Sequence, residues 1–187
     1  MNTVSLPPDE WRCGILISRV PKDGTAYSES FSLPLDAAIS HWGQEYIPAE
    51  PIHADIEASY VNERILARVI CRAEFTLPCS RCLAETRVAI FGDLRYLFTL
   101  SGDAPEDDDE ADDGDVDVIP VDAFESEIEM TPYIWEALLL NLPERALCSE
   151  NCKGLCHICG YDKNIGDCGC KEDNPDPRLA VLRDLME

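Results

Sequence analysis

Cysteine is the residue type in this sequence whose spacing points most directly to chemistry. The 187-residue chain has ten cysteines. Two thiolates separated by two residues can hold one side of a metal ion, and structural zinc takes four ligands in a tetrahedron. The close pairs are Cys79/Cys82, Cys148/Cys152, Cys156/Cys159 and Cys168/Cys170. They predict two closed metal sites of four thiolates each, with Zn²⁺ as the expected cofactor.

Spacing alone leaves the grouping of these pairs open. The preferred grouping has one site of Cys79, Cys82, Cys148 and Cys152, and a second site of Cys156, Cys159, Cys168 and Cys170. The alternative is a single C-terminal site of Cys152, Cys156 and Cys159 with Cys168 or Cys170, which leaves Cys79 and Cys82 as a free or oxidised pair. The same thiolates could also hold an iron–sulfur cluster.

The other candidates for chemistry are weaker. Cys13 and Cys71 have no close partner and lie in apolar strand patterns, where cysteine behaves as a small hydrophobic residue. His157 lies inside a C-x-x-C pair, so its ring should point outward and make a poor ligand. Sites with four cysteines lack the open position that a catalytic zinc keeps for water. With no phosphate-binding or nucleophile motif in the chain, we expect a protein that is not an enzyme.

The compartment follows from the same cysteines and from the absence of targeting signals. The N-terminus has no signal-peptide apolar core. The longest continuous apolar run, Ala137 to Leu140, is far shorter than a bilayer requires. Closely spaced cysteines inside a cell are more often metal ligands than disulfides. We therefore expect a cytoplasmic protein that makes no membrane contact.

Charge is strongly unbalanced. Fifteen lysines and arginines stand against 37 acids, a formal charge of −22, which argues against a broad surface for nucleic acid or membranes. Ten of the acids lie between Asp103 and Asp117. Like-charge repulsion extends such a segment and it cannot be buried, so the sequence predicts a flexible acidic loop over residues 101–120. The loop could attract a basic partner.

Alternation of apolar and polar residues predicts strands before this loop. Ile65 to Leu77 alternates with a period of two, Ile52 to Tyr60 does the same, and Asn62-Glu63 between them predicts an antiparallel hairpin. A third strand is expected from Thr86 to Leu100, with a bulge or turn at Gly92-Asp93. A short strand within Cys13 to Val20 completes a mainly β region over residues 1–100.

Helix signals follow the loop. Thr131-Pro132 offers a cap followed by proline, and apolar residues continue until Pro143, which predicts a buried helix packed on the sheet within residues 121–147. Asp176-Pro177 repeats the signal, and an amphipathic helix should close a cysteine-rich module over residues 148–187. The predicted fold class is α+β: an antiparallel sheet with a buried helix and a C-terminal, zinc-ribbon-like cysteine-rich module.

Three stretches, in this order, resemble the YceD family. They are PCSRCL at residues 78–83, LNLPERALCSENCKGLCHICGYDKN at residues 140–164, and CGC followed by DPRLAVLRDL at residues 176–185. The resemblance runs from about Ile52 to the end of the chain, whereas the acidic segment and the first 50 residues match loosely. It implies a cytoplasmic role in the synthesis, processing or stability of large-subunit ribosomal RNA. It implies no catalytic residues.

One region of the chain is locally basic. From Tyr60 to Arg95 there are six arginines and four acids, and Arg68 and Arg72 share one face of a strand. These two could contact RNA phosphates, or they could be ordinary solvated arginines. Two function classes remain: a zinc-stabilised assembly factor that binds large-subunit ribosomal RNA or its precursor particle, and an acidic adaptor or chaperone for a basic ribosomal protein.

Overall fold

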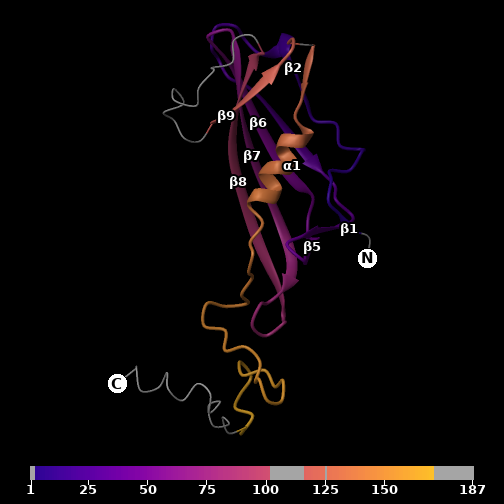
Figure 1. Ribbon diagram of the computed structural model, residues 1–187, viewed down its shortest axis with the longest axis vertical. Helices are drawn as coiled ribbons and strands as arrows, with labels where there is room; N and C mark the ends of the chain where they lie inside the picture. The colour runs from indigo at the N-terminus through magenta and orange to yellow at the C-terminus, as the bar shows by residue number, and fades with distance from the viewer. Residues whose placement is uncertain (1–2, 102–115, 125, 171–187) are drawn as a thin grey trace, which may run out of the picture.

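The computed structural model describes residues 3–101, 116–124 and 126–170. Long strands form an elongated, curved sheet, one helix lies along one face, and the cysteine-rich segment extends beyond one end (Figure 1). The strands are β1 (Thr3–Val4), β2 (Gly14–Leu16), β3 (Tyr27–Leu33), β4 (Ala38–His41), β5 (Gln44–Pro48), β6 (Ile52–Val61), β7 (Arg64–Pro78), β8 (Glu85–Leu100), β9 (Val116–Val121) and β10 (Glu127–Glu129). The helix is α1 (Thr131–Leu140), and a short 3-10 turn, η1, covers Ile17–Arg19.

Strand β7 is the centre of the sheet. It pairs with β8 along one edge and with β6 and then β5 along the other, and β3 extends the sheet beyond β6. These pairings are antiparallel, as predicted. Two pairs depart from the prediction because they are parallel: β9 with β8, and β1 with β4. β2 and β10 form a separate two-stranded ladder.

The alternating pattern of the long strands has its expected physical basis. In β7, every second side chain from Ile65 to Leu77 is buried. Those between them lie on the other side of the sheet and are more exposed, except for Ile70, which is also buried. The predicted hairpin is confirmed, because Asn62 and Glu63 alone join β6 to β7. Their φ angles of 49° and 62° suit the two-residue turn whose twist matches that of paired strands.

The predicted bulge at Gly92-Asp93 is wrong. Strand β8 pairs with β7 without interruption, and Gly92 lies opposite Cys71. The glycine has a different cause, which is the close approach of α1. A Cβ atom on Gly92 would lie 2.7 Å from the carbonyl oxygen of Ala137 and 2.9 Å from Nδ2 of Asn141. Gly92 therefore lets the helix backbone reach the sheet.

The structure also bears on the predicted short strand within Cys13 to Val20 and on the predicted acidic loop. Within Cys13 to Val20 the strand covers only Gly14–Leu16, and η1 follows it directly. Residues 116–120 of the predicted acidic loop belong to β9, where Asp117 lies opposite Tyr96. The other nine acids of the run and the predicted C-terminal helix lie outside the described residues.

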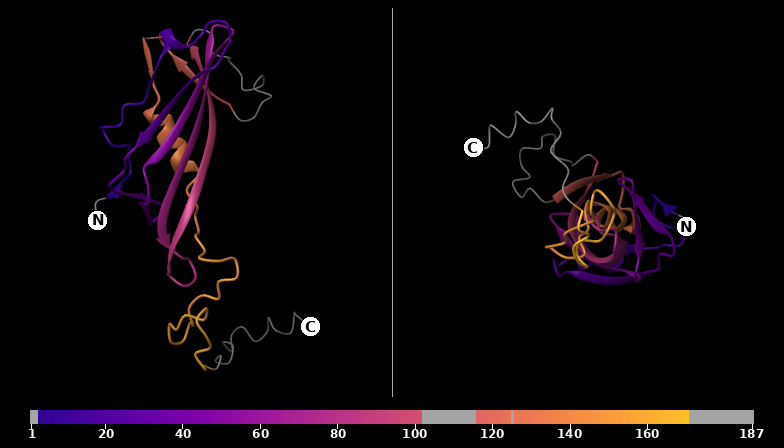
Figure 2. Two further views of the ribbon diagram at one scale, coloured as in Figure 1. Left: turned by 180° about the vertical axis from the view of Figure 1, so that it is seen from behind. Right: turned by 90° about the horizontal axis from the view of Figure 1, so that it is seen from below.

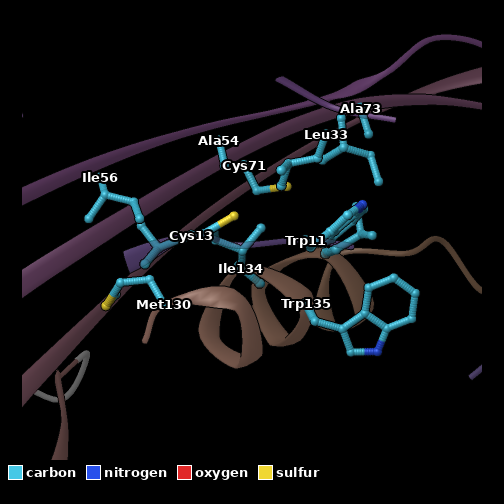
Figure 3. Close-up of a cluster of buried hydrophobic side chains, with 14 of the residues drawn as sticks. Trp11, Cys13, Leu33, Ala54, Ile56, Cys71, Ala73, Met130, Ile134 and Trp135 are labelled. Atoms are coloured by element: carbon cyan, nitrogen blue, oxygen red, sulfur yellow. The ribbon is translucent and has the colours of Figure 1, made fainter. Parts of the chain in front are cut away.

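The core lies between α1 and the sheet (Figure 3). Trp11 and Trp135 meet edge to face, with ring centroids 5.7 Å apart, and the indole nitrogen of Trp11 donates to the carbonyl oxygen of Pro34 at 2.9 Å. Cys13 and Cys71 are buried there among apolar side chains, and burial raises the pKa of Cys71 to about 12. Both cysteines thus act as small hydrophobic residues, as expected.

Helix α1 is covered on the face that meets the sheet and open at its last turn. Ile134, Ala137 and Leu138 are buried, whereas Leu140 is 64% exposed. In the part of the chain that the structure describes, no helix is long and apolar enough to span a membrane.

Replacing Gly92 with alanine should destabilise the protein. The added methyl group meets backbone atoms of α1 that cannot rotate away, and such overpacking costs about 1–3 kcal/mol. For a chain of this size the melting temperature should fall by roughly 3–10 °C in a thermal denaturation measurement. Ala89→Val, at an exposed position of the same strand, is the control and should leave the melting temperature nearly unchanged. Equal melting temperatures for all three proteins would contradict the close approach of α1.

Candidate metal centres

The first cysteine cluster joins the tip of the β7–β8 hairpin to the segment that follows α1. Cys79 comes directly after β7, Cys82 lies three residues before β8, and Cys148 and Cys152 come from beyond the helix. All four Sγ atoms lie within 4.8 Å of one another. The Sγ atoms of Cys79 and Cys152 are 3.8 Å apart, and those of Cys82 and Cys148 are 3.5 Å apart.

These distances fit a metal tetrahedron and exclude disulfides. Sulfur ligands about 2.3 Å from a central zinc ion lie about 3.8 Å from one another along the tetrahedron edge. A disulfide would bring two sulfur atoms to about 2.05 Å, and all ten cysteines are free. The first cluster could therefore accept an ion among its sulfur atoms with little movement.

The second cluster is built within the cysteine-rich segment itself. It consists of Cys156, Cys159, Cys168 and Cys170, whose Sγ atoms also lie within 4.8 Å of one another. The structure thus brings the eight cysteines together in the first of the two groupings considered from the sequence. His157 belongs to neither cluster.

The same backbone loop occurs once in each cluster. The amide of Cys79 donates to the carbonyl oxygen of Ala84 at 2.8 Å, and the amide of Leu83 donates to that of Cys79 at 2.9 Å. Cys156 and Gly160 repeat this pattern, both bonds being 2.8 Å long. The residue after the second cysteine has positive φ in both loops, 62° at Leu83 and 72° at Gly160. Glycine adopts this conformation readily, whereas leucine gives no sequence signal for it, so Leu83 could not be recognised as part of such a loop from the sequence.

Further hydrogen bonds fix the cysteine-rich segment to the hairpin tip. The amide of Ser80 donates to the carbonyl oxygen of Ala146 at 2.8 Å, and that of Leu155 donates to the carbonyl oxygen of Arg81 at 3.1 Å. The guanidinium group of Arg81 donates to the carbonyl oxygen of Cys152 at 2.8 Å. The side-chain amide of Asn164 donates to Sγ of Cys152 at 3.4 Å. The two segments are therefore held together around the first cluster.

The electrostatics of the clusters favour a bound cation. Hydrogen bonds from backbone amides, chiefly that of Cys159, lower the pKa of Cys156 to about 6. The neighbouring thiols of Cys159 and Cys168 raise the pKa of Cys170 to about 12. Without a cation, four thiolates this close repel one another, so only part of each cluster ionises near neutral pH. A divalent ion removes that repulsion and releases protons when it binds.

The two clusters differ in exposure. In the first, Cys79, Cys82 and Cys152 are buried. In the second, Cys156 is buried, Cys159 is exposed, and Cys168 and Cys170 are intermediate. Four sulfur donors and no oxygen donor are typical of structural zinc or of iron–sulfur clusters, and neither set leaves a ligand position for water.

Arg68 and Arg72 lie on the outer face of β7, as the alternation predicted, and each is paired with acidic side chains. Arg68 meets both carboxylate oxygens of Asp93, at 2.8 and 2.6 Å, and lies 3.4 Å from Glu57. Arg72 lies 2.5 Å from Asp55, and its guanidinium group is 5.7 Å from the centre of the Phe91 ring. Hydrogen bonding to Arg68 lowers the pKa of Asp93. Both arginine charges are therefore compensated within the sheet.

Comparison with known proteins gives consistent matches. The family model for large ribosomal RNA subunit accumulation protein YceD matches residues 67–186. The chloroplastic YCED homolog 1 of Zea mays is 30% identical over 149 residues, which cover 68% of this chain and 51% of that protein. Its Arabidopsis thaliana counterpart is 26% identical over 164 residues, which cover 77% of this chain and 51% of that protein. The protein YlbN of Bacillus subtilis strain 168 is 24% identical over 172 residues, which cover 91% of this chain and 93% of that protein.

The chain spans about half the length of the two plant proteins that it matches. No solved structure matches it. All eight clustered cysteines lie within the matched residues 67–186.

Protein purified without added metal should contain about two zinc ions per chain, measured by elemental analysis. Cys79→Ser and Cys168→Ser should each remove about one ion, because each disrupts a different cluster. The first change should also make residues 143–170 sensitive to protease, since it removes their attachment to the hairpin. Ser80→Ala, an exposed position inside the first loop, is the control and should keep both ions. Iron with visible absorption, or one ion per chain in the parent, would contradict this assignment.

Proposed function

The chain belongs to the YceD family of large ribosomal RNA subunit accumulation proteins, and from this premise we propose that it is a non-enzymatic factor that supports the accumulation of large-subunit ribosomal RNA. The observation that carries the proposal is the family match over residues 67–186, which includes both cysteine clusters, most of β7 and all of β8. We place this activity in the cytoplasm.

We propose further that both clusters hold zinc in a structural role. The support is the set of four sulfur donors in each cluster, all within 4.8 Å of one another. In the first cluster, two S···S distances lie near a tetrahedron edge and the amide of Arg81 donates to Sγ of Cys79. Zinc has no redox chemistry of its own, and a four-sulfur site offers no position for a substrate. Zinc would therefore stabilise the cysteine-rich segment and its attachment to the hairpin rather than catalyse a reaction.

Direct contact with ribosomal RNA through Arg68 and Arg72 is one route to this function. Phosphate oxygens would have to compete with the carboxylates of Asp93 and Asp55, which already pair with the two guanidinium groups. Arginine binds carboxylate and phosphate in the same bidentate geometry, so the exchange is chemically reasonable, but it must overcome the existing ion pairs.

Binding of a basic ribosomal protein is the second route, and the charge distribution favours it. The chain carries a formal charge of −22, and Arg68 and Arg72 of its one basic region are compensated by Asp93, Glu57 and Asp55. Such a surface repels RNA phosphates and attracts basic proteins. The protein would then act on ribosomal RNA indirectly, as an acidic adaptor or chaperone for a protein that the RNA later binds.

Cells that lack the protein should contain less large-subunit ribosomal RNA relative to small-subunit ribosomal RNA. The ratio, measured by quantitative hybridisation, should return when the parent chain is supplied. The Cys79→Ser variant should restore it less well, because the cysteine-rich segment loses its attachment, whereas Ser80→Ala should restore it fully. An unchanged ratio in the absence of the protein would overturn the proposed function.

Recovery of ribosomal partners should resist ribonuclease if the adaptor route is correct. The tagged protein is purified from cell extract with and without ribonuclease, and we expect the same basic proteins in both samples. The variant Arg68→Gln/Arg72→Gln should leave this recovery unchanged, as should Arg87→Gln, the control, which removes a similar ion pair with Glu74.

RNA-dependent recovery would support the direct route instead. In that case the double variant should bind large-subunit ribosomal RNA more weakly, with the slope of log affinity against log salt reduced by about two. Arg87→Gln would then show whether any exposed arginine of the sheet has the same effect.

A further inference from the structure

The second cysteine cluster lacks the cover that the first cluster has. Three of the four cysteines of the first cluster are buried, whereas Cys159 of the second is exposed and Cys168 and Cys170 are intermediate. Both clusters present the same four sulfur donors. The apolar shell around a metal site controls how far solvent reaches the ligands. Among the described residues, that shell is incomplete around the second cluster.

A hollow of about 470 Å³ lies beside the second cluster. Its lining includes Ile158, Gly166 and three of the candidate ligands, Cys156, Cys168 and Cys170. We name this hollow the cluster groove. Ile158 is 47% exposed, so an apolar side chain and candidate metal ligands border the same open space.

Apolar surface continues around the cluster groove. Tyr161 reaches its wall, since a Cβ atom on Gly166 would lie 3.4 Å from the Tyr161 hydroxyl oxygen. Ile165 directly precedes Gly166 and is 77% exposed, and Tyr161 is 40% exposed. Apolar side chains that are exposed together mark a contact surface more often than the same side chains scattered singly.

The part of the chain that follows the second cluster has an apolar face of its own. Residues 171–187 lie outside the described residues, but the sequence places Leu179, Leu182 and Met186 at spacings of three and four. Such spacing puts the three side chains on one face of a helix. The family model matches the chain as far as residue 186, so the family pattern includes this segment.

The connection to this segment is short, which limits what the segment can cover. Residues 171–175 span at most roughly 17 Å when fully extended, and a helix over residues 176–186 would be roughly 16 Å long. Cys170, from which the segment continues, itself lines the cluster groove. Figure 2 shows the cysteine-rich segment extending beyond the tip of the β7–β8 hairpin, with α1 further back along the sheet. The cluster groove is therefore the first exposed apolar surface within reach.

We propose that the cluster groove binds residues 176–186 of the same chain, folded as an amphipathic helix whose apolar face covers Ile158 and the neighbouring sulfur atoms. The helix would give the second cluster the cover that the hairpin tip gives the first. A short connection keeps the local concentration of the segment high, so the contact needs little affinity of its own. The proposal stands apart from the question of which ribosomal partner the protein binds.

Two pairs of matched variants test the contact in the full chain. Leu182→Asp places a charge on the apolar face of the segment, whereas Ala180→Asp places the same charge two residues away, on the opposite side of the helix. In the second pair, Ile158→Asp changes the groove. Its control is Leu140→Asp, which changes a side chain of α1 that is 64% exposed.

Amide hydrogen exchange, followed by mass spectrometry, should be slow in residues 176–186 of the parent. We expect Leu182→Asp and Ile158→Asp to raise the exchange rate there about tenfold, and the two controls to leave it unchanged. In a methyl-labelled parent, NMR should show nuclear Overhauser effects between the methyl groups of Leu182 and Ile158. Strand β7 should exchange equally slowly in all five proteins, because the core is untouched.

Fast exchange of residues 176–186 in the parent, or equal exchange in Leu182→Asp and Ala180→Asp, would overturn the proposal. This first pair lies outside the groove, so its result does not depend on how well Ile158→Asp folds. An unchanged rate in Ile158→Asp would show that the segment binds elsewhere, and release by Leu140→Asp would place it on α1. Protection that is lost on dilution would make a second copy of the chain the occupant, which also contradicts the proposal.

Discussion

The two parts of this molecule meet at four cysteine sulfur atoms, two from the tip of the β7–β8 hairpin and two from the segment that begins 66 residues later. Among the described residues of the cysteine-rich segment, the buried apolar side chains are those of Cys152 and Cys156. Cys152 forms a small cluster with Leu155 and with Cys79 and Cys82 of the hairpin tip, separate from the main core. The position of the segment therefore depends on the thiols and on the hydrogen bonds around them. The β7–β8 hairpin serves two purposes, since the strands that form the core also position Cys79 and Cys82, half of a candidate metal site.

The fold could be predicted where one local rule decided the structure. Strands β6 and β7 and the turn between them follow from alternation and from Asn62, because one face is buried along its whole length. Gly92 shows the limit of such rules. A glycine in a strand suggests a bulge, but here it admits a helix from 45 residues further along the chain, and no local pattern encodes that contact.

In the candidate site, too, local sequence predicted some features and others depended on the three-dimensional structure. Cysteine type and spacing predicted the clusters, whereas their grouping required the three-dimensional structure, since several groupings have equally acceptable spacing. Arg68 and Arg72 were predicted on the correct face, but their ion pairs with Asp93 and Asp55 cross from one strand to another and depend on register. The positive φ of Leu83 in the first cysteine loop was not predicted, because leucine gives no sequence signal for that conformation.

The wide separation of the first cluster along the chain has a consequence for synthesis. Cys79 and Cys82 are made before Cys148 and Cys152, and at about 5–20 residues per second the interval for 66 residues is roughly 3–13 s. During that time the β7–β8 hairpin can form while its tip carries only two thiols of an incomplete set. A metal ion captured early would be held by half of its ligands and would be exchangeable until the later pair arrived. The order of the chain thus makes completion of the first cluster a late step, after the sheet that supports it.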